Sequence, residues 1–326
     1  MKRAIYRTTA FGFILALGVG AGIAVQKYLN VSNHIAGLMR RVGLYRYVAA
    51  PNAAIKDQLI PVTIPPEAQG QLRLYVLVGQ SNMVGKAKVP EGFEVPQNTY
   101  TFGNDYQWHE AEVPVDNDEG QVDAVSADEF TGFGPALAFA RSLIAENPDQ
   151  PIGLIPCAKS GSSIAEWERS VDDQSLYGSC LKRVRAASPM GTVSGILFFQ
   201  GEADTIDPRQ FPNLRPAAEA WAEKFAAFAY NFRRDIGNPG TPLVFAQIGQ
   251  PDDLEGLPNW TLVQQQQENI QIPNAIMIRT SDLQMADNIH YTADSYATIG
   301  ERYADAMRSI STGLANDRDV NPPKDS

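Results

Sequence analysis

The 326-residue chain is long enough for one large domain, or at most two small ones, with a well-buried core. Its formal net charge of −10 argues against a surface that binds nucleic acid or another polyanion. Two cysteines and three histidines occur, and none of their spacings is that of metal ligands, so we expect no metal site.

The N-terminus predicts a membrane segment. Lys2, Arg3 and Arg7 precede residues 8–26, an uncharged and largely apolar run near the lower length limit for crossing a bilayer. We expect residues 1–27 to form an uncleaved signal anchor, so that the body of the protein is exported and held in the cell envelope. Cleavage after Ala24 is the alternative, and it would leave a secreted or periplasmic protein. Residues 28–70 are then a juxtamembrane connector.

From residue 71 onward, apolar strand patterns alternate with helical ones. Strands are expected at 72–79, 152–157, 195–200, 243–248 and 275–280, and helices at 134–146, 174–187, 214–236, 262–271 and 292–310. This alternation predicts an α/β domain, a three-layer α/β/α sandwich around a mostly parallel sheet. The irregular segment 84–131 is expected to cross the carboxyl edge of the sheet, where substrate would bind, and residues 312–326 to form a disordered tail.

The end of the first predicted strand is the first candidate for chemistry. Gly79 permits a sharp turn, and Ser81 follows it at the edge of the sheet where α/β proteins place ligands. A serine there can act as a nucleophile, with nearby backbone N–H groups directed at the developing negative charge. The alternative is that Ser81 only caps the helix that follows.

Three later segments also end apolar strands with polar residues. Gly161 lies in the loop 158–163 and leaves a backbone N–H open to close approach. Gln200 offers a neutral amide donor suited to an oxyanion, and Glu202 follows it closely. His290 comes three residues after Asp287, a spacing that lets the carboxylate fix the tautomer of the imidazole.

Four motifs in this order resemble the SGNH hydrolase superfamily, and most closely its sialate O-acetylesterase-like members, carbohydrate esterase family 6. They are Gly79-Gln80-Ser81-Asn82-Met83, the block at 159–167, the block at 200–204 and Asp287-x-x-His290. The resemblance covers residues 71–311 and implies an SGNH-type esterase domain with a flavodoxin-like sheet. No cofactor is implied, because the imidazole and its carboxylate can activate the serine by themselves.

The resemblance also implies the role of each residue. Ser81 would be the nucleophile, His290 the general base and Asp287 the third member of the triad, with Glu202 as the rival acid. The oxyanion hole would consist of the N–H groups of Ser81 and Gly161 and the side chain of Gln200.

Candidate substrate contacts are Gln80, Asn82, Trp167 and His109, although Trp167 has helix packing as an equal alternative. Export would permit a disulfide between Cys157 and Cys180; otherwise Cys157 is expected to pack as a small apolar residue.

These features predict a serine esterase that removes acetyl groups from an acetylated carbohydrate through an acetyl-serine intermediate. Two alternatives remain at this point: transfer of the acetyl group to a second sugar, and a non-catalytic protein that binds envelope polysaccharide. The motifs specify neither the sugar nor the oligomeric state.

Overall fold

The structure is a computed structural model that describes residues 60–209 and 214–313. The predicted signal anchor at 1–27, most of the connector at 28–70 and nearly all of the predicted tail lie outside the described residues. Within the described ranges, no helix combines the length and apolar character needed to cross a bilayer.

The fold is built on a seven-stranded sheet with the order β3-β2-β4-β1-β5-β6-β7. All neighbouring pairs are parallel except β2 and β3, which are antiparallel at one edge. The strands are β1 (Leu72–Gly79), β2 (Thr99–Phe102), β3 (Trp108–Glu110), β4 (Ile152–Pro156), β5 (Gly191–Phe199), β6 (Leu243–Ala246) and β7 (Ala275–Ile278). The sequence-based prediction of a mostly parallel sheet is therefore confirmed.

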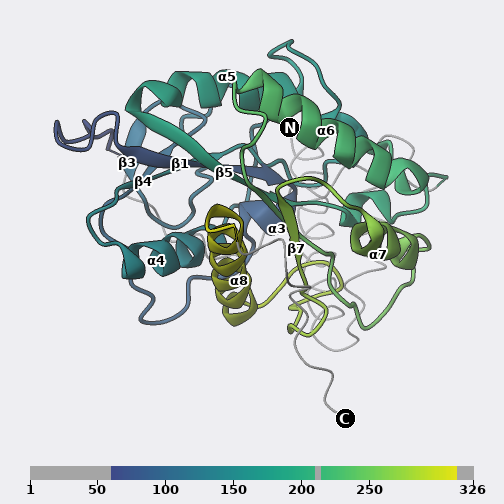
Figure 1. The fold of residues 1–326 in the computed structure, drawn as a ribbon. Coiled ribbons are helices and arrows are strands. Elements are labelled where there is room, and N and C mark those ends of the chain that lie inside the picture. Colours follow the sequence, from purple (N-terminus) through teal and green to yellow (C-terminus); the bar gives the residue numbers. More distant parts are fainter. Residues whose placement is uncertain (1–59, 210–213, 314–326) are drawn as a thin grey trace, which may run out of the picture. The chain divides into compact units, whose positions relative to one another are not determined.

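Helices cover both faces of this sheet, which gives the three layers (Figure 1). Helices α5, α6 and α7 pack on one face and α4 and α8 on the other, each layer with its own apolar cluster. The α-helices are α3 (Ser81–Val84), α4 (Ala136–Glu146), α5 (Leu176–Ala187), α6 (Trp221–Asp235), α7 (Trp260–Asn269) and α8 (Ala293–Ser311), and the short 3₁₀ turns are η2 (Ile164–Trp167), η3 (Ser188–Met190), η4 (Glu202–Asp204) and η6 (Ala218–Ala220).

The central strand β1 is buried from both sides because helices lie above and below it. Seven of its eight residues are buried, as expected for a strand inside a parallel sheet. At the edge, β2 and β3 correct the prediction for 84–131, which was expected to be irregular. They are short strands that pair with each other and extend the sheet through β4.

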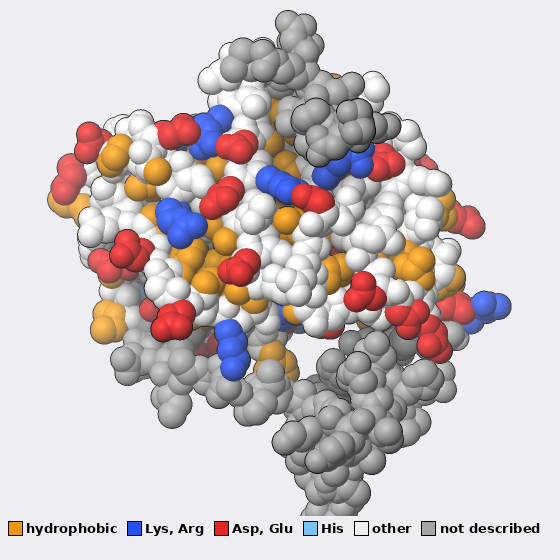
Figure 2. All heavy atoms as spheres, turned by 90° about the horizontal axis from the view of Figure 1, so that it is seen from below, with side chains coloured by type: hydrophobic (Ala, Val, Ile, Leu, Met, Phe, Trp, Pro, Cys, Tyr) orange, Lys and Arg blue, Asp and Glu red, His pale blue; other side chains and the backbone are white. Residues whose placement is uncertain are grey.

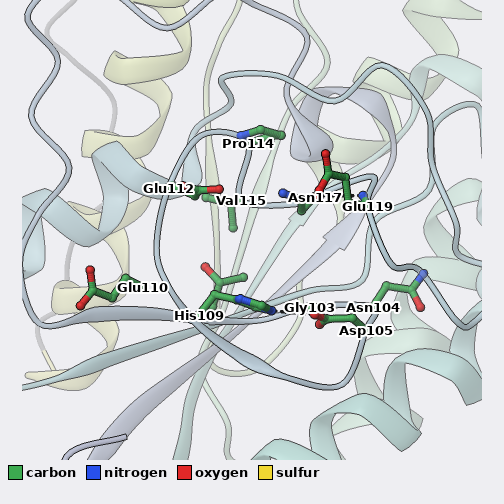
Figure 3. Close-up of a pocket in the computed structure, with 11 residues that line it drawn as sticks. Gly103, Asn104, Asp105, His109, Glu110, Glu112, Pro114, Val115, Asn117 and Glu119 are labelled. Carbon is green, nitrogen blue, oxygen red and sulfur yellow. Dashed lines mark hydrogen bonds and ion pairs between the residues drawn. The ribbon is translucent and has the colours of Figure 1, made fainter. Parts of the chain in front are cut away.

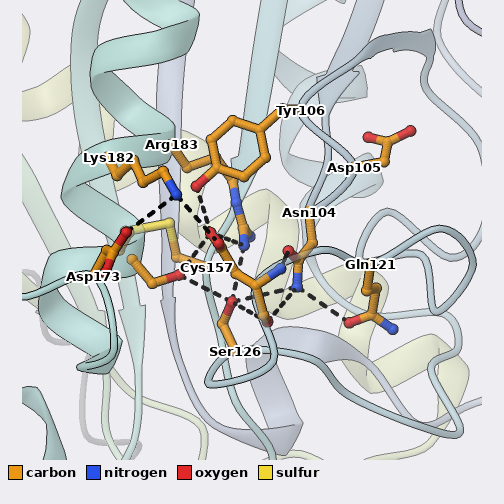
Figure 4. A network of polar contacts seen from close by, with 12 residues as sticks. Asn104, Asp105, Tyr106, Gln121, Ser126, Cys157, Asp173, Lys182 and Arg183 are labelled. Carbon is orange, nitrogen blue, oxygen red and sulfur yellow. Dashed lines mark hydrogen bonds and ion pairs between the residues drawn. A yellow bond between two sulfur atoms is a disulfide. The ribbon is translucent and has the colours of Figure 1, made fainter.

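A buried polar network anchors the long segment 84–131 on α5 (Figure 4). The guanidinium of Arg183, only 1% exposed, donates to Ser126 Oγ at 2.9 Å and lies 3.8 Å from Asp123 Oδ2. Cys157 and Cys180 form a disulfide beside this network, which joins the end of β4 to α5. Cys157 is therefore half of a cross-link and not simply an apolar packing residue.

The outer surface carries charges of both signs. On the face seen in Figure 2, Asp and Glu side chains are widely spread, and Lys and Arg side chains lie singly among them. This pattern agrees with the net negative charge of the chain.

Candidate active site

The turn after β1 has a backbone that only glycine fits at residue 79. Gly79 has φ +138°, and a Cβ built there would lie 2.0 Å from the carbonyl oxygen of Phe199 in β5. The Gln80 N–H donates to the same carbonyl at 2.8 Å, and α3 begins at Ser81. The close contact between β1 and β5 thus fixes Ser81 at the carboxyl edge of the sheet, as the sequence predicted.

Ser81, His290 and Asp287 form one hydrogen-bonded chain. His290 Nε2 lies 3.0 Å from Ser81 Oγ, and His290 Nδ1 lies 2.9 Å from Asp287 Oδ2. Burial raises the pKa of Asp287, but the hydrogen bonds and charge of His290 outweigh it, so the net pKa is below its ordinary value. An ionised Asp287 fixes the imidazole with its proton on Nδ1, which leaves Nε2 free to accept the serine proton.

The rival acid Glu202 is close to this chain but has a different partner. Its Oε1 accepts a hydrogen bond from Asn82 Nδ2 at 2.5 Å, and its side chain is only 2% exposed. Burial raises the pKa of Glu202 to about 7, so the buried carboxyl gains a proton near neutral pH. Of the two candidate acids, Asp287 is the one that contacts the imidazole.

Two backbone N–H groups are available beside Ser81. Gly161 is exposed at φ +74°, in a loop held by hydrogen bonds from Lys159 N to Gly79 O and from Ser160 N to Asp128 Oδ2, 3.0 and 2.6 Å long. Neither the Ser81 N–H nor the Gly161 N–H has an acceptor among the described residues. A Cβ at Gly161 would meet no atom within 4 Å, so there is space for a ligand at this point.

Gln200 does not occupy the oxyanion position that the sequence predicted. Its side chain is fully buried, and its Nε2 donates to Asp204 Oδ2 at 2.5 Å and to Ser162 O at 3.1 Å. Its Oε1 accepts from Trp221 Nε1 at 2.8 Å. Because the amide is enclosed and its hydrogen bonds are made within the protein, this prediction is wrong.

The side chain of Gln80, itself only 2% exposed, lies beside Gln200 and donates no hydrogen bond to a described residue. Its Oε1 accepts from Gln200 Nε2, Gly201 N and Ala203 N at 3.3, 3.4 and 3.1 Å. Two of these donors are backbone N–H groups, so the atom that faces them must be the oxygen. Nε2 therefore points away from these donors. The sequence predicted Gln80 only as a candidate substrate contact.

None of the other three predicted substrate contacts is presented to a substrate at this site. Trp167 is fully buried against Phe228, which confirms the packing alternative. His109 lies in β3 at the far edge of the sheet, where its Nε2 is 2.6 Å from Asp105 Oδ2 and it lines a separate pocket (Figure 3). Asn82 has no exposed surface, so it cannot touch a substrate.

The described residues contain no group of His, Cys, Asp or Glu side chains arranged to hold a metal ion. A serine, an imidazole and a carboxylate in line at the carboxyl edge of a parallel sheet, next to open N–H groups, form the constellation of a serine hydrolase.

Comparison with known proteins identifies the family. Residues 71–309 match the family described as carbohydrate esterase, sialic acid-specific acetylesterase, and the chain belongs to it. A probable carbohydrate esterase of Arabidopsis thaliana is 27% identical over 268 residues, which cover 75% of this chain and 94% of that protein. The protein is therefore an esterase, and the resemblance seen in the motifs is confirmed.

Solved structures agree with this assignment. The structure of the Arabidopsis thaliana protein matches with a TM-score of 0.60 at 26% identity. The match covers 74% of this chain and 99% of the Arabidopsis chain. A carbohydrate acetylesterase from Xanthomonas citri shares the fold, with a TM-score of 0.53 at 21% identity over 74% of this chain and 56% of its own.

Proposed function

We propose that this esterase hydrolyses O-acetyl esters on a carbohydrate through an acetyl-Ser81 intermediate. The observation that carries the proposal is the chain Ser81–His290–Asp287, with contacts of 3.0 and 2.9 Å, beside open N–H groups. The family and the acetylesterase among its structural neighbours support an acetylated carbohydrate as substrate.

The first half-reaction forms the acetyl-enzyme. His290 Nε2 takes the proton of Ser81 Oγ as the oxygen attacks the acetyl carbonyl carbon, and Asp287 stabilises the resulting imidazolium. The tetrahedral intermediate collapses when the bond to the sugar oxygen breaks, and His290 returns the proton to that oxygen. In the second half-reaction His290 activates a water molecule, which releases acetate and regenerates Ser81.

Three donors would hold the oxyanion: the N–H groups of Ser81 and Gly161 and the Nε2 of Gln80. Gln200 Nε2 lies within hydrogen-bond distance of both Gln80 Oε1 and Ser162 O, so the Gln80 amide lies beside the 161–162 segment. Gln200 thus orients the donor and does not itself supply it. One such donor typically contributes a factor on the order of 10²–10³ to turnover.

The test is acetate release from a panel of acetylated oligosaccharides by the full chain and by Ser81→Ala. We expect release by the wild type only, together with an acetyl adduct on the peptide containing Ser81 after rapid acid quench. Turnover by folded Ser81→Ala would refute the assignment. Product analysis with an acetyl-free sugar present separates hydrolysis from acetyl transfer, because transfer would yield a newly acetylated acceptor.

We also propose that residues 1–27 anchor the protein in the cell envelope, on the strength of their charge and apolar pattern. The Cys157–Cys180 disulfide supports an oxidising compartment. Fractionation tests the anchor: the full chain should require detergent for release from membranes, and complete release by high salt would refute it.

A further inference from the structure

The residue after the nucleophile makes three hydrogen bonds to three different elements, two of them buried and one partly buried. Asn82 Nδ2 donates to Glu202 Oε1 at 2.5 Å and to the carbonyl oxygen of Ile289 at 2.9 Å. Its Oδ1 accepts from the hydroxyl of Tyr296 at 2.6 Å. The Ile289 carbonyl can only accept, so the orientation of the amide is fixed. One side chain therefore joins α3, η4, the loop before α8 and α8 itself.

The Ile289 carbonyl belongs to the peptide unit that leads directly into the general base. The other end of that unit, the His290 N–H, donates to Asp287 Oδ1 at 2.7 Å. A peptide unit is planar, so contacts at its carbonyl and its N–H fix its plane and the position of the following Cα. Asn82 holds the first of these two ends, and the acid of the triad holds the second.

We propose that Asn82 is a positioning residue for the general base, which holds the His290 loop in register with Ser81 while Glu202 and Tyr296 orient its amide. The proposal rests on the proposed function, since it concerns the same triad. It replaces the two roles expected from the sequence, a substrate contact for Asn82 and a triad acid for Glu202.

Glu202 suits this role because of its burial. Its Oε1 accepts from Asn82, and its Oε2 has no hydrogen-bond partner among the residues that the structure describes. A carboxyl that accepts one hydrogen bond in a buried site needs no negative charge to do so. A glutamine presents the same acceptor oxygen at the same distance along the side chain.

The main test is Asn82→Ala, with kcat and KM measured on an acetylated sugar and on a small acetate ester. Displacement of a catalytic group by about 1 Å costs on the order of 10²-fold in rate. We expect kcat to fall by about this factor on both esters, with KM changed by less than about threefold. A substrate-contact role would instead raise KM, and only for the sugar.

Two substitutions at Glu202 test whether its acceptor oxygen is what orients Asn82. Glu202→Gln keeps the acceptor for Asn82 and should retain kcat within about threefold of wild type, whereas Glu202→Leu removes the acceptor and should approach Asn82→Ala. The double variant Asn82→Ala/Glu202→Leu should be little worse than either single one, because both act through one contact. A loss of about 10²-fold or more in folded Glu202→Gln would overturn the role given to Glu202.

Two tyrosines of α8 offer a matched pair of milder changes. Tyr296→Phe removes the hydroxyl that orients Asn82, and Tyr303→Phe removes an equally buried hydroxyl that donates to the Phe198 carbonyl at 2.8 Å. Loss of one such hydrogen bond corresponds to roughly 3- to 10-fold. Tyr296→Phe should lose that factor in kcat, and Tyr303→Phe should not, although both lower the melting temperature by a few degrees.

The outcomes separate this inference from the proposed function. If the wild type releases no acetate from any ester, the proposed function fails. If the wild type is active and folded Asn82→Ala keeps kcat within threefold, the positioning role is refuted. Should Asn82→Ala not fold, equal kcat values for Tyr296→Phe and Tyr303→Phe would refute it in the same way.

Discussion

Replacement of Asp287 by asparagine should stop catalysis through the tautomer of His290. Asp287 Oδ1 accepts the N–H groups of Ile289 and His290, both at 2.7 Å. In Asp287→Asn the amide oxygen must keep that place, because backbone N–H groups can only donate. The new NH₂ group then faces His290 Nδ1, where Oδ2 lies 2.9 Å away in the wild type.

An NH₂ group at that position requires Nδ1 to accept, so the imidazole proton moves to Nε2. Nε2 lies 3.0 Å from Ser81 Oγ and would then donate to the serine and could not take its proton. The same change in a Ser-His-Asp triad costs about 10⁴ in kcat, which corresponds to about 5 kcal/mol in the activation barrier. We expect a loss of this order, with KM almost unchanged.

The assay is acetate release near neutral pH, and the matched control is Asp282→Asn. Asp282 is on the same connection between β7 and α8 but pairs with Arg302, so its substitution should leave kcat within about twofold. Long-range ¹H–¹⁵N spectra report which nitrogen of His290 carries the proton. If Asp287→Asn kept more than a tenth of wild-type turnover, or left the proton on Nδ1, the reasoning would be refuted.

Three further predictions concern other parts of the site. Gln80→Met should lower kcat by about 10²–10³ through loss of an oxyanion donor, and wild-type turnover would remove Gln80 from that role. Burial raises the pKa of Glu202 from 4.5 to about 7, so the stability that its proton contributes is complete below pH 4.5 and is lost as the pH rises to 7. In denaturant unfolding, the free energy of unfolding of Glu202→Gln relative to that of the wild type should therefore rise by on the order of 3 kcal/mol between about pH 5 and pH 8. A difference that does not change with pH would contradict the raised pKa. The double substitution Cys157→Ser/Cys180→Ser opens a loop with a sequence separation of 23 and should reduce the free energy of unfolding by about 3 kcal/mol, whereas unchanged stability would contradict the cross-link.

The sequence predicted the elements whose signals are local. The apolar run at 72–79 has the same bounds as β1. The helix expected at 292–310 corresponds to α8, whose N-cap Thr292 accepts a hydrogen bond from Ser295 N. Strands β2 and β3 were missed because each is short and lies among turn-forming residues. Their pairing with each other and with β4 depends on contacts far along the chain, which a local pattern cannot reveal.

The sequence predicted which residues form the triad, but it did not predict how the amide side chains around the triad are oriented. Ser81, His290 and Asp287 meet as the motifs implied, because a parallel sheet brings the carboxyl ends of its strands to one edge. The sequence did not show that Gln200 turns its amide inward, or how the amide of Gln80 is oriented. The Gln80 orientation is fixed by the backbone N–H groups of Gly201 and Ala203, more than a hundred residues beyond Gln80 in the chain.

The distance along the chain between Ser81 and His290, 209 residues, also has a kinetic consequence. A loop of this length must close before the two side chains meet, so we expect their contact to form late in folding. Regain of esterase activity during refolding should therefore lag behind the burial of Trp167 and Trp221. Enzymatic activity would then report the last stage of refolding, and tryptophan fluorescence would report the earlier stages.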